Sequence, residues 1–344
     1  MSKKKISCTR ENVLHEDLFH DWHQLWLEQK GHYFNSPYWY KACVDAFEIN
    51  EDDIYIFVCR SEDEIVGILP LIRVKKYGFS YLKFPGEKYL DQGCLLVQQK
   101  STVVVTELVE TASSFCRLLY LAEIREVQLF NQSKAVVKLG SECPYIDMRA
   151  GAFHEMKPKR YRRRKNKIKK HSDQLKFKMF QGKEISEYID VLFEIEGNSP
   201  KAKNNLDIFR ERSARKLYEN IIYQQESTVL ALLYYEDIAI AHIFALKTGD
   251  SITDIHTAYL EEYMNLSPGT LLLFLFVEHV AEDSGVEYYD LSRGVTVQKK
   301  EYTSKINSQY NIYITNFIGM NIIRSAFFLK DMVRSLKEKY RSTR

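Results

Sequence analysis

The spacing of hydrophobic residues along the first half of the chain predicts helices first and then strands. Apolar residues recur every three or four positions in the opening segments, which is typical of helices with one buried face. Runs of β-branched and aromatic residues follow and predict strands. Pro70 lies inside one such run and indicates an edge or a bulge, because proline cannot donate a ladder hydrogen bond. The expected elements are helices at 14–30, 38–47 and 102–121, and strands at 54–60, 65–74, 79–84, 126–130 and 145–148.

The second half repeats this order of helices, a strand hairpin, a further strand, a helix and a strand. Such self-similarity predicts two copies of one α/β module. The hairpin turns over Glu236-Asp237, between two runs rich in β-branched and aliphatic residues. The expected elements are strands at 175–180, 228–235, 238–247, 251–259, 288–291 and 311–317, and helices at 185–196, 207–224 and from Pro268 to Gly285.

The sequence Ser267-Pro268-Gly269-Thr270 joins the strand at 251–259 to a strongly apolar helix. Proline fits the first turn of a helix, and glycine lets the backbone approach a ligand closely. A helix N-terminus carries unpaired N–H groups and the positive end of the helix dipole, which together favour a phosphate. The segment therefore predicts the phosphate cradle of an acyltransferase cofactor. An ordinary Pro-Gly helix start is the alternative.

Composition and charge change this picture in one place. A chain of 344 residues with 45% hydrophobic and 28% charged residues is typical of a globular protein with two domains. The net charge of +3 hides a run from Lys157 to Lys170 that has no acidic residue. Six cysteines, all in the first half and without a C-x-x-C pair, predict reduced thiols in a cytoplasmic protein. No signal peptide and no membrane-spanning run is expected.

Four features of the chain together resemble one family. They are the two similar modules, the basic run between them, the Ser-Pro-Gly-Thr loop, and the sequence from Tyr289 to Gly294 followed by Lys299-Lys300. The second half resembles the Gcn5-related N-acetyltransferase (GNAT) fold, and the whole arrangement resembles BioF2-like or CelD-type acyltransferases, relatives of the FemAB aminoacyl transferases. The resemblance implies an α/β fold (an α+β mixed sheet) of two tandem GNAT-like modules joined by a basic linker helix. The implied parts are a degenerate module at 1–150, the linker at 151–174, a donor-binding module at 175–317 and an amphipathic helix at 318–344.

The resemblance also implies where the donor binds. The strand before the loop would lend backbone N–H groups to the thioester carbonyl as an oxyanion hole, and the amides that start the helix would hold the phosphates. The loop has one glycine and lacks the Gln/Arg-x-x-Gly-x-Gly/Ala pattern of the wider superfamily. The identity of the donor is therefore undecided among acyl-CoA, an acyl carrier protein and an aminoacyl-tRNA. We expect acyl-CoA. The expected cofactor-binding residues are Ile255, Thr257, Ser267, Gly269, Thr270 and Leu271.

Acyl transfer needs a base for the acceptor and an acid for the leaving thiolate. His256 is a candidate base because the pKa of histidine is near neutral, Asp290 is a second candidate, and Tyr302 is a candidate acid. Arg293, Lys299 and His242 are candidate substrate-binding residues. For each of them an ordinary structural role competes: a core histidine, a turn cap, a salt bridge between Asp290 and Arg293, or a solvated lysine. No metal is expected.

The run from Lys157 to Lys170 has three interpretations: an RNA-binding segment, a peripheral contact with an anionic membrane, or a linker helix that braces the modules. Because Tyr161 is its one aromatic residue, it has little equipment for stacking on bases, and we do not expect nucleic acid as a partner. The predicted function is transfer of an acyl group from acyl-CoA to an amine or hydroxyl of a small-molecule, glycan or lipid-linked acceptor, in polysaccharide or cell-envelope biosynthesis. The alternatives are FemAB-like aminoacyl transfer to a peptidoglycan precursor and a non-catalytic scaffold.

Overall fold

A computed structural model of the chain describes residues 6–76, 78–130, 135–204, 207–224, 227–283, 285–315, 319, 321 and 323. The chain forms two compact units. The first contains the residues up to Leu25, Asn50–Gly140 and the residues from Gln309 on; the second contains Trp26–Ile49 and Ser141–Ser308. The units therefore group the chain differently from the predicted contiguous parts 1–150, 151–174 and 175–317.

The second unit contains a mixed sheet in the order β8-β9-β10-β11-β12-β7. All neighbours are antiparallel except β11 and β12, which are parallel and are connected through helix α8. The strands are β7 (Ala135–Asp147), β8 (Leu175–Gln181), β9 (Thr228–Tyr235), β10 (Ile238–Thr248), β11 (Ser251–Tyr259) and β12 (Tyr288–Asp290).

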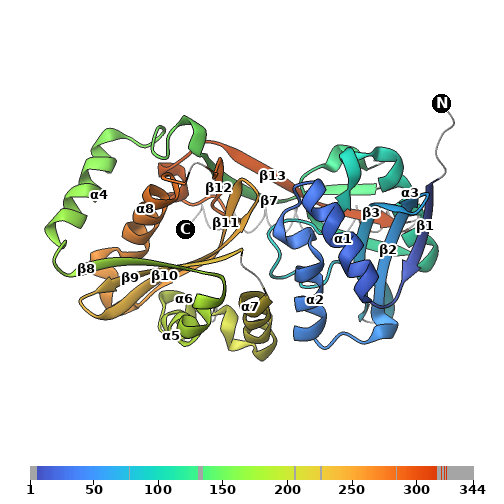
Figure 1. Cartoon of the computed structure of the whole chain (residues 1–344), viewed down its shortest axis with the longest axis horizontal. Helices are drawn as coiled ribbons and strands as arrows, with labels where there is room; N and C mark the ends of the chain where they lie inside the picture. Colours follow the sequence, from blue (N-terminus) through green and yellow to red (C-terminus); the bar gives the residue numbers. More distant parts are fainter. Residues whose placement is uncertain are drawn as a thin grey trace, which may run out of the picture. The chain divides into compact units, whose positions relative to one another are not determined.

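Helices cover both faces of this sheet (Figure 1). The apolar helix α8 (Pro268–Val280) packs on one face, where Phe276 lies 5.4 Å from the ring of Tyr289 on β12. The opposite face is covered by α5 (Ile189–Gly197) and α7 (Arg212–Gln224), and Tyr218 of α7 contacts Phe244 of β10 at 5.7 Å. The remaining helices of this unit are α2 (Pro37–Ala46), α4 (Pro158–Lys170) and the single turn α6 (Pro200–Lys203).

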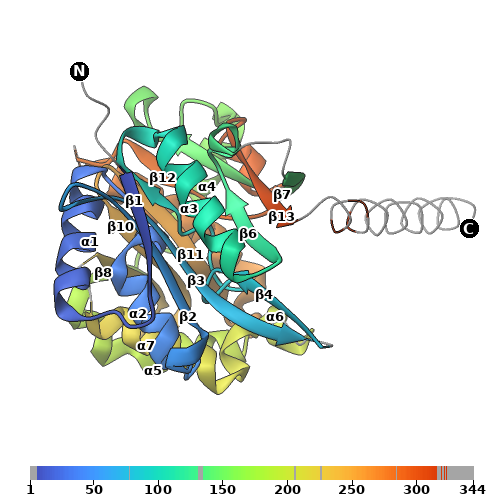
Figure 2. The same ribbon diagram turned by 90° about the vertical axis from the view of Figure 1, so that its right-hand side faces the viewer.

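The first unit has a sheet of the same design, in the order β1-β2-β3-β4-β6-β13, with β4 and β6 parallel. Helix α3 (Thr102–Phe115) lies between them in sequence and packs on β1, β2 and β3 (Figure 2). Helix α1 (Glu16–Glu28) lies between β1 and β2 in sequence. The strands are β1 (Ile6–Glu11), β2 (Ile54–Ser61), β3 (Glu64–Lys76), β4 (Phe79–Lys83), β6 (Leu118–Ile124) and β13 (Ile306–Thr315), and a short β5 (Leu96–Val97) pairs with β3.

Both sheets therefore have four strands in antiparallel succession, a helix, a parallel fifth strand and an antiparallel sixth strand. The predicted α/β fold with a mixed sheet and two similar modules is confirmed. The sixth strands are exchanged in sequence. Strand β7 directly follows β6 but pairs with β12, and β13 follows β12 but pairs with β6. The last strand of the second unit's sheet, β7, thus follows the first unit's β6 in sequence. The last strand of the first unit's sheet, β13, follows the second unit's β12.

Several predicted elements have different bounds in the structure. The expected helix at 102–121 ends at Phe115, and the rest of that apolar run belongs to β6. The expected strand at 126–130 is instead a short 3₁₀ turn, Val127–Leu129. Pro70 lies within the interior strand β3, between the residues that pair with β5 and those that pair with β4. The missing N–H of Pro70 therefore falls where the neighbouring ladder is interrupted.

The expectation that all six cysteines are reduced thiols is wrong for one pair. Cys8 on β1 and Cys59 on β2 are directly opposite in the antiparallel ladder, their Cα atoms are 4.2 Å apart, and they form a disulfide. The other four cysteines are free. The misjudgement arose because the pairing of β1 with β2 brings together residues 51 positions apart in sequence, which no local spacing reveals.

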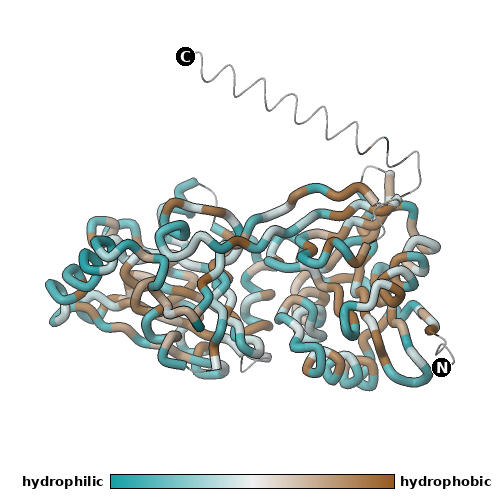
Figure 3. Tube along the Cα trace, turned by 90° about the horizontal axis from the view of Figure 1, so that it is seen from above, coloured by the Kyte–Doolittle hydropathy of each residue, from teal (hydrophilic) through white to brown (hydrophobic). Residues whose placement is uncertain are grey.

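The basic run folds as helix α4, the hydrophilic segment at the left edge of Figure 3. Pro158 occupies its first turn, where a missing N–H costs no helical hydrogen bond. The predicted amphipathic helix at 318–344 lies outside the described residues, except for residues 319, 321 and 323. Among the described residues, no helix is both long enough and apolar enough to cross a membrane.

Candidate functional site

Strands β11 and β12 pair over a short length and then separate. The parallel register joins Ser251 to Tyr288, Ile252 to Tyr289 and Thr253 to Asp290. Strand β12 ends at Asp290, whereas β11 continues to Tyr259. Within the described chain, the segment Asp254–Tyr259 therefore keeps β10 as its neighbour and has no β12 partner on its other edge. Backbone groups on that edge are able to pair with an extended ligand.

Strand β11 is irregular where it leaves β12. Phe244 of β10 is opposite His256, but the next residue, Ala245, is opposite Asp254, so Ile255 is an extra residue that forms a β-bulge. Ala245 belongs to the core on the α8 side of the sheet. Asp254 therefore points toward α8, and His256 points toward α5 and α7. Asp254 and His256 are two positions apart and would share one face of a regular strand, but the bulge interrupts the alternation and places them on opposite faces.

Beyond the bulge, a backbone carbonyl group on the edge of β11 accepts a hydrogen bond from a lysine ammonium group. Lys201 Nζ of α6 donates to the carbonyl oxygen of Thr257 at 2.7 Å. In a regular antiparallel strand the N–H and the C=O of one residue point to the same edge. The Thr257 N–H therefore also points away from β10, toward the side that β12 has left. A hydrogen-bond donor and a positive charge thus meet at this edge.

Helix α8 begins just beyond β11 with one available amide. The N–H groups of Thr270 and Leu271 both donate to the Ser267 carbonyl at 3.1 Å, and the Ser267 N–H donates to Met264. Pro268 has no N–H. Among the described residues, the Gly269 N–H donates to no backbone carbonyl. Of the four predicted cradle amides, Gly269 is therefore the one that a ligand could occupy without breaking a backbone hydrogen bond.

Gly269 lies close to the end of β11. A Cβ atom at this position would be 3.2 Å from Cδ1 of Tyr259, tighter than an ordinary contact. The cap residue Ser267 has a left-handed backbone with φ of 54°, an uncommon conformation for a residue that carries a side chain. Lys167 of α4 donates from Nζ to Ser267 Oγ at 3.3 Å and to the Asn265 carbonyl at 3.2 Å. A lysine thus adds its charge to the positive end of helix α8.

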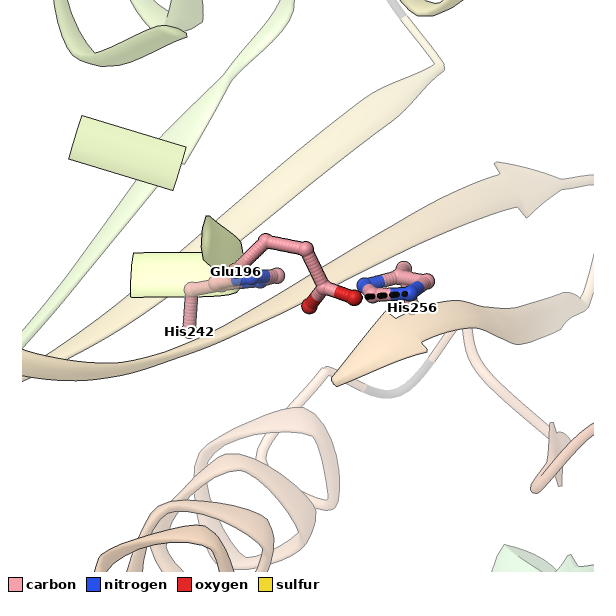
Figure 4. A group of neighbouring side chains, drawn as sticks. All are labelled: Glu196, His242 and His256. Carbon is pink, nitrogen blue, oxygen red and sulfur yellow. Dashed lines mark ion pairs between the residues drawn. The ribbon is translucent and has the colours of Figure 1, made fainter. Parts of the chain in front are cut away.

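A second group of polar side chains lies on the opposite side of β11, under α5. Glu196 of α5, His242 of β10 and His256 of β11 are 0%, 0% and 8% exposed. Figure 4 shows the Glu196 carboxylate directed at His256; Glu196 Oε1 is 3.4 Å from His256 Nε2, and the two imidazole rings stack with centroids 5.7 Å apart. Neither carboxylate oxygen, neither nitrogen of His242 nor Nδ1 of His256 has a hydrogen-bond partner among the described residues.

Burial controls the charge of these three groups. It raises the pKa of Glu196 to about 7; the charge of Lys201 and the nearby backbone N–H of Ile208 oppose this increase, and the charge of Asp207 supports it. Burial, with the charge of Lys201, lowers the pKa of His242 to about 3 and holds the pKa of His256 well below 6.5. Both imidazoles are therefore neutral at pH 7, and each offers a lone pair.

A cleft opens close to the end of β11. It has a volume of about 420 Å³ and is lined by residues of the α5–α6 turn and of the segment that follows β11, among them Ser199, Lys203, Leu260 and Glu261. Lys203 and Glu261 form an ion pair across it. Two of its lining residues, Ser199 and Lys203, flank Lys201 in sequence.

Residues 157–302 match the family model described as the acetyltransferase (GNAT) domain. These residues form a GNAT acetyltransferase domain. This match confirms the predicted resemblance to GNAT proteins and supports the predicted acyltransferase class. No curated protein sequence matches this chain significantly.

Solved structures share the fold of almost the whole chain. The C-terminal domain of a putative lysylphosphatidylglycerol synthetase from Agrobacterium fabrum is 13% identical, with a TM-score of 0.60 over 89% of this chain and 94% of that chain. L-PGS from Bacillus licheniformis is 13% identical, with a TM-score of 0.55 over 82% and 93%. FemX is 9% identical, with a TM-score of 0.65 over 92% and 99%. At these identities the comparisons establish the fold.

The GNAT domain places the other predicted site residues in several environments. Asp290 is buried, its carboxylate accepts the N–H of Ser292 at 2.8 Å, and it points to the face opposite to Tyr289. Lys299 donates to the carbonyl groups of Ser292 and Arg293, so it fixes the loop after β12. These contacts match the alternative structural roles, in which Asp290 caps a turn and Lys299 stabilises a loop. The catalytic role of Asp290 and the substrate-binding role of Lys299 stay predictions.

Tyr302 lies apart from the histidines, in the core on the α8 side of the GNAT domain. The side chain is fully buried, and the Arg164 guanidinium lies 4.8 Å from the centre of its ring. Burial raises the pKa of the hydroxyl well above 10. The structure therefore brings together His242 and His256, but places Tyr302 in another part of the domain.

The sequence interpretation missed Glu196, Lys201 and Lys167. Glu196 falls four residues after Leu192 and three after Phe193, both buried on α5. A carboxylate at these spacings lies on the apolar face of a helix, and this signal was available. For Lys201 and Lys167 no comparable signal existed, because their partners are backbone carbonyls of distant loops and strands.

Proposed function

We propose that this protein transfers an acyl group from a CoA thioester to an amine or hydroxyl acceptor. The observation that carries the proposal is the separation of β11 from β12 at the Ile255 bulge, together with the contact distance between Gly269 at the start of α8 and Tyr259 at the end of β11. An extended pantetheine arm fits along an unpaired strand edge, and a diphosphate fits at a helix start with an available amide and an added lysine. The GNAT domain that spans these elements supports the same assignment.

In this proposal the acceptor attacks the thioester carbonyl carbon, the carbonyl oxygen takes up negative charge, and collapse of the intermediate breaks the carbon–sulfur bond. The Thr257 N–H and the Lys201 ammonium supply positive charge at the edge where that oxygen would lie. The acceptor loses its proton to a base, and the departing thiolate takes up a proton. The predicted base, His256, is neutral and turned toward α5, so we place the acceptor on that side of the sheet.

The donor site is tested by two lysines of α4. Lys167→Gln removes the charge beside Ser267, and we expect about a tenfold loss of affinity for acetyl-CoA, the size of one lost charge-assisted hydrogen bond. Lys169→Gln is the matched control, because Lys169 is exposed on the same helix and has no described ion pair. Isothermal titration calorimetry measures both affinities. Equal affinities in the two variants would remove α8 as the phosphate site.

Aminoacyl transfer from an aminoacyl-tRNA is the second candidate, and one observation favours it. Helix α4 exposes lysines and arginines that have no ion pair among the described residues, in addition to those paired with Glu278 and Glu301. Two solved proteins with the same fold are the C-terminal domain of a putative lysylphosphatidylglycerol synthetase and FemX. Salt-sensitive binding of aminoacyl-tRNA together with no binding of acetyl-CoA would favour this candidate. Cell-envelope or polysaccharide precursors remain the proposed acceptors for both.

A further inference from the structure

The cluster of Glu196, His242 and His256 is unusual because it is polar and buried, and because several of its side-chain atoms have no hydrogen-bond partner within the geometric limits among the described residues. Its side chains come from α5, β10 and β11, so three separate elements converge on one point. One donor atom from each residue can be chosen so that all three lie within 4.8 Å of one another. Buried polar groups are nearly always hydrogen-bonded, and five such atoms in one cluster need an explanation.

We infer that Glu196, His242 and His256 bind a divalent transition-metal ion of the zinc type. Two imidazoles and one carboxylate are a frequent zinc donor set, and three protein ligands leave a fourth coordination position open. A bound ion would accept lone pairs from the atoms that lack partners. The assignment departs from the sequence-based expectation of no metal, which considered cysteine spacings and did not include Glu196.

The geometry requires only small side-chain movements. Zinc–nitrogen and zinc–oxygen bonds of roughly 2.0–2.2 Å place tetrahedral ligand atoms roughly 3.3–3.5 Å apart. Glu196 Oε1 and His256 Nε2 are already 3.4 Å apart. The widest pair in the cluster, at 4.8 Å at most, has to close by a little over one ångström. Rotation of His242 about its side-chain bonds is sufficient for a shift of this size.

The charges around the cluster act in both directions. The two imidazoles are neutral, the state in which histidine binds metals, and a dication would favour the ionised carboxylate of Glu196. The Lys201 ammonium is close enough to lower the pKa of all three groups and therefore opposes a second positive charge. Its hydrogen bond to the Thr257 carbonyl holds it on the strand edge. Asp207, which raises the pKa of Glu196, contributes a compensating negative charge.

This inference deepens the proposed function. The role of the metal in acyl transfer rests on the proposed function, whereas metal binding itself does not. A metal on His256 would occupy a lone pair of the predicted base. The ion would then act on the acceptor in its place, by coordinating the amine or hydroxyl and lowering its pKa so that the proton is released to solvent. Donor binding at β11 and α8 does not depend on this step.

The test uses the full-length, untagged protein after removal of metals with EDTA. We expect one equivalent of zinc to bind in isothermal titration calorimetry, and one equivalent of cobalt to give the absorption bands of a four-coordinate site. Glu196→Gln and His256→Gln should each weaken zinc binding at least 100-fold. The matched controls are Glu194→Gln, on the exposed face of the same helix, and His279→Gln, exposed near the end of α8; both should bind as the wild type does.

Absence of stoichiometric zinc or cobalt binding to the wild-type protein would overturn the inference, and so would unchanged binding in both Glu196→Gln and His256→Gln. Thermal unfolding of each variant without metal shows whether it is folded. Acetyl-CoA affinity is measured in parallel. Loss of metal binding with intact donor binding would reject the metal site alone, whereas loss of donor binding in the wild type would reject the proposed function.

Discussion

At the scale of single residues, Glu196 has the clearest consequence for stability. In the folded protein its pKa is about 7, whereas an ordinary glutamate has a pKa near 4.5. Between these values the native state keeps a proton that the unfolded chain releases. The free energy of unfolding therefore falls as the pH rises through this window, by at most about 3 kcal/mol at 1.36 kcal/mol per pKa unit.

Glu196→Gln should remove this dependence. Relative to the wild type, the variant should become more stable by about 2–3 kcal/mol as the pH rises from 4.5 to 8, because glutamine does not ionise. Urea unfolding of both proteins at several pH values in EDTA provides the measurement. The lowered pKa of His242 acts in the opposite direction, with stability lost as the pH falls from 6.5 toward 3, but it is common to both proteins. Parallel pH curves for the two proteins would show that Glu196 is not a buried acid.

The residues of the site were only partly predictable from the sequence. Gly269 and His256 were found because a Pro-Gly helix start and a histidine on a strand are local features. The direction of His256 relative to Asp254 was not predictable, because a bulge is set by how two strands pair. Glu196 carried a usable signal in its helical spacing, whereas Lys201 acts through a backbone carbonyl that no sequence pattern indicates.

At the scale of elements, α4 is held to its unit by arginines that share one carboxylate. Arg164 and Arg160 both pair with Glu301, and Arg164 also contacts Met156 Sδ at 3.2 Å and the ring of Tyr302. The Arg164 side chain is 9% exposed, whereas that of Arg160 is 42% exposed. The pairing of Arg164 thus has to offset the cost of burying its charge.

Glu301→Gln should therefore destabilise the protein by about 2 kcal/mol, because it leaves Arg164 buried without its counter-ion. Arg160→Gln, which removes the exposed partner of the same carboxylate, should cost less than about 1 kcal/mol. Chemical denaturation of the two variants compares these values. Equal effects would mean that the burial of Arg164 does not set the strength of this contact.

The elements that the sequence predicted well have local causes. Helix α2 begins at Ser36-Pro37, where the Ser36 hydroxyl accepts the Trp39 N–H at 3.2 Å, as the sequence indicated. The end of α3 was missed because the apolar run continues without glycine or proline into β6. Strand β6 exists because it pairs with β4 and with β13, which lies almost 200 residues further along the chain. Pairing at that distance overrides local periodicity.

At the scale of the whole molecule, the exchanged sixth strands make the two units dependent on each other's sequence. The first unit takes β13 from the C-terminal part of the chain, and the second takes α2, together with the part of β7 from Ser141 on, from the first half. A division at about residue 150, which the sequence suggested, cuts through this exchange. Strand partners far apart in the chain cannot be assigned from periodicity alone.

Fragments 1–150 and 151–344 should therefore not fold independently. The first lacks β13, which leaves β6 as an unpaired edge, and the second lacks both α2 and β7. Circular dichroism during urea unfolding should show no cooperative transition for either fragment, whereas the full chain should unfold cooperatively. A cooperative transition in the first fragment would contradict the assignment of β13 to the first unit.

The central claim is that a thioester donor binds along the open edge of β11 and at the start of α8. Titration of CoA into the wild-type protein and into Gly269→Asp tests it most directly, because the added carboxylate would occupy the space beside Tyr259 and repel a phosphate. The account predicts one CoA bound per wild-type chain and none bound to the variant, which should still unfold in one cooperative transition. Equal CoA affinity in both proteins, or no CoA binding to the wild type, would contradict it.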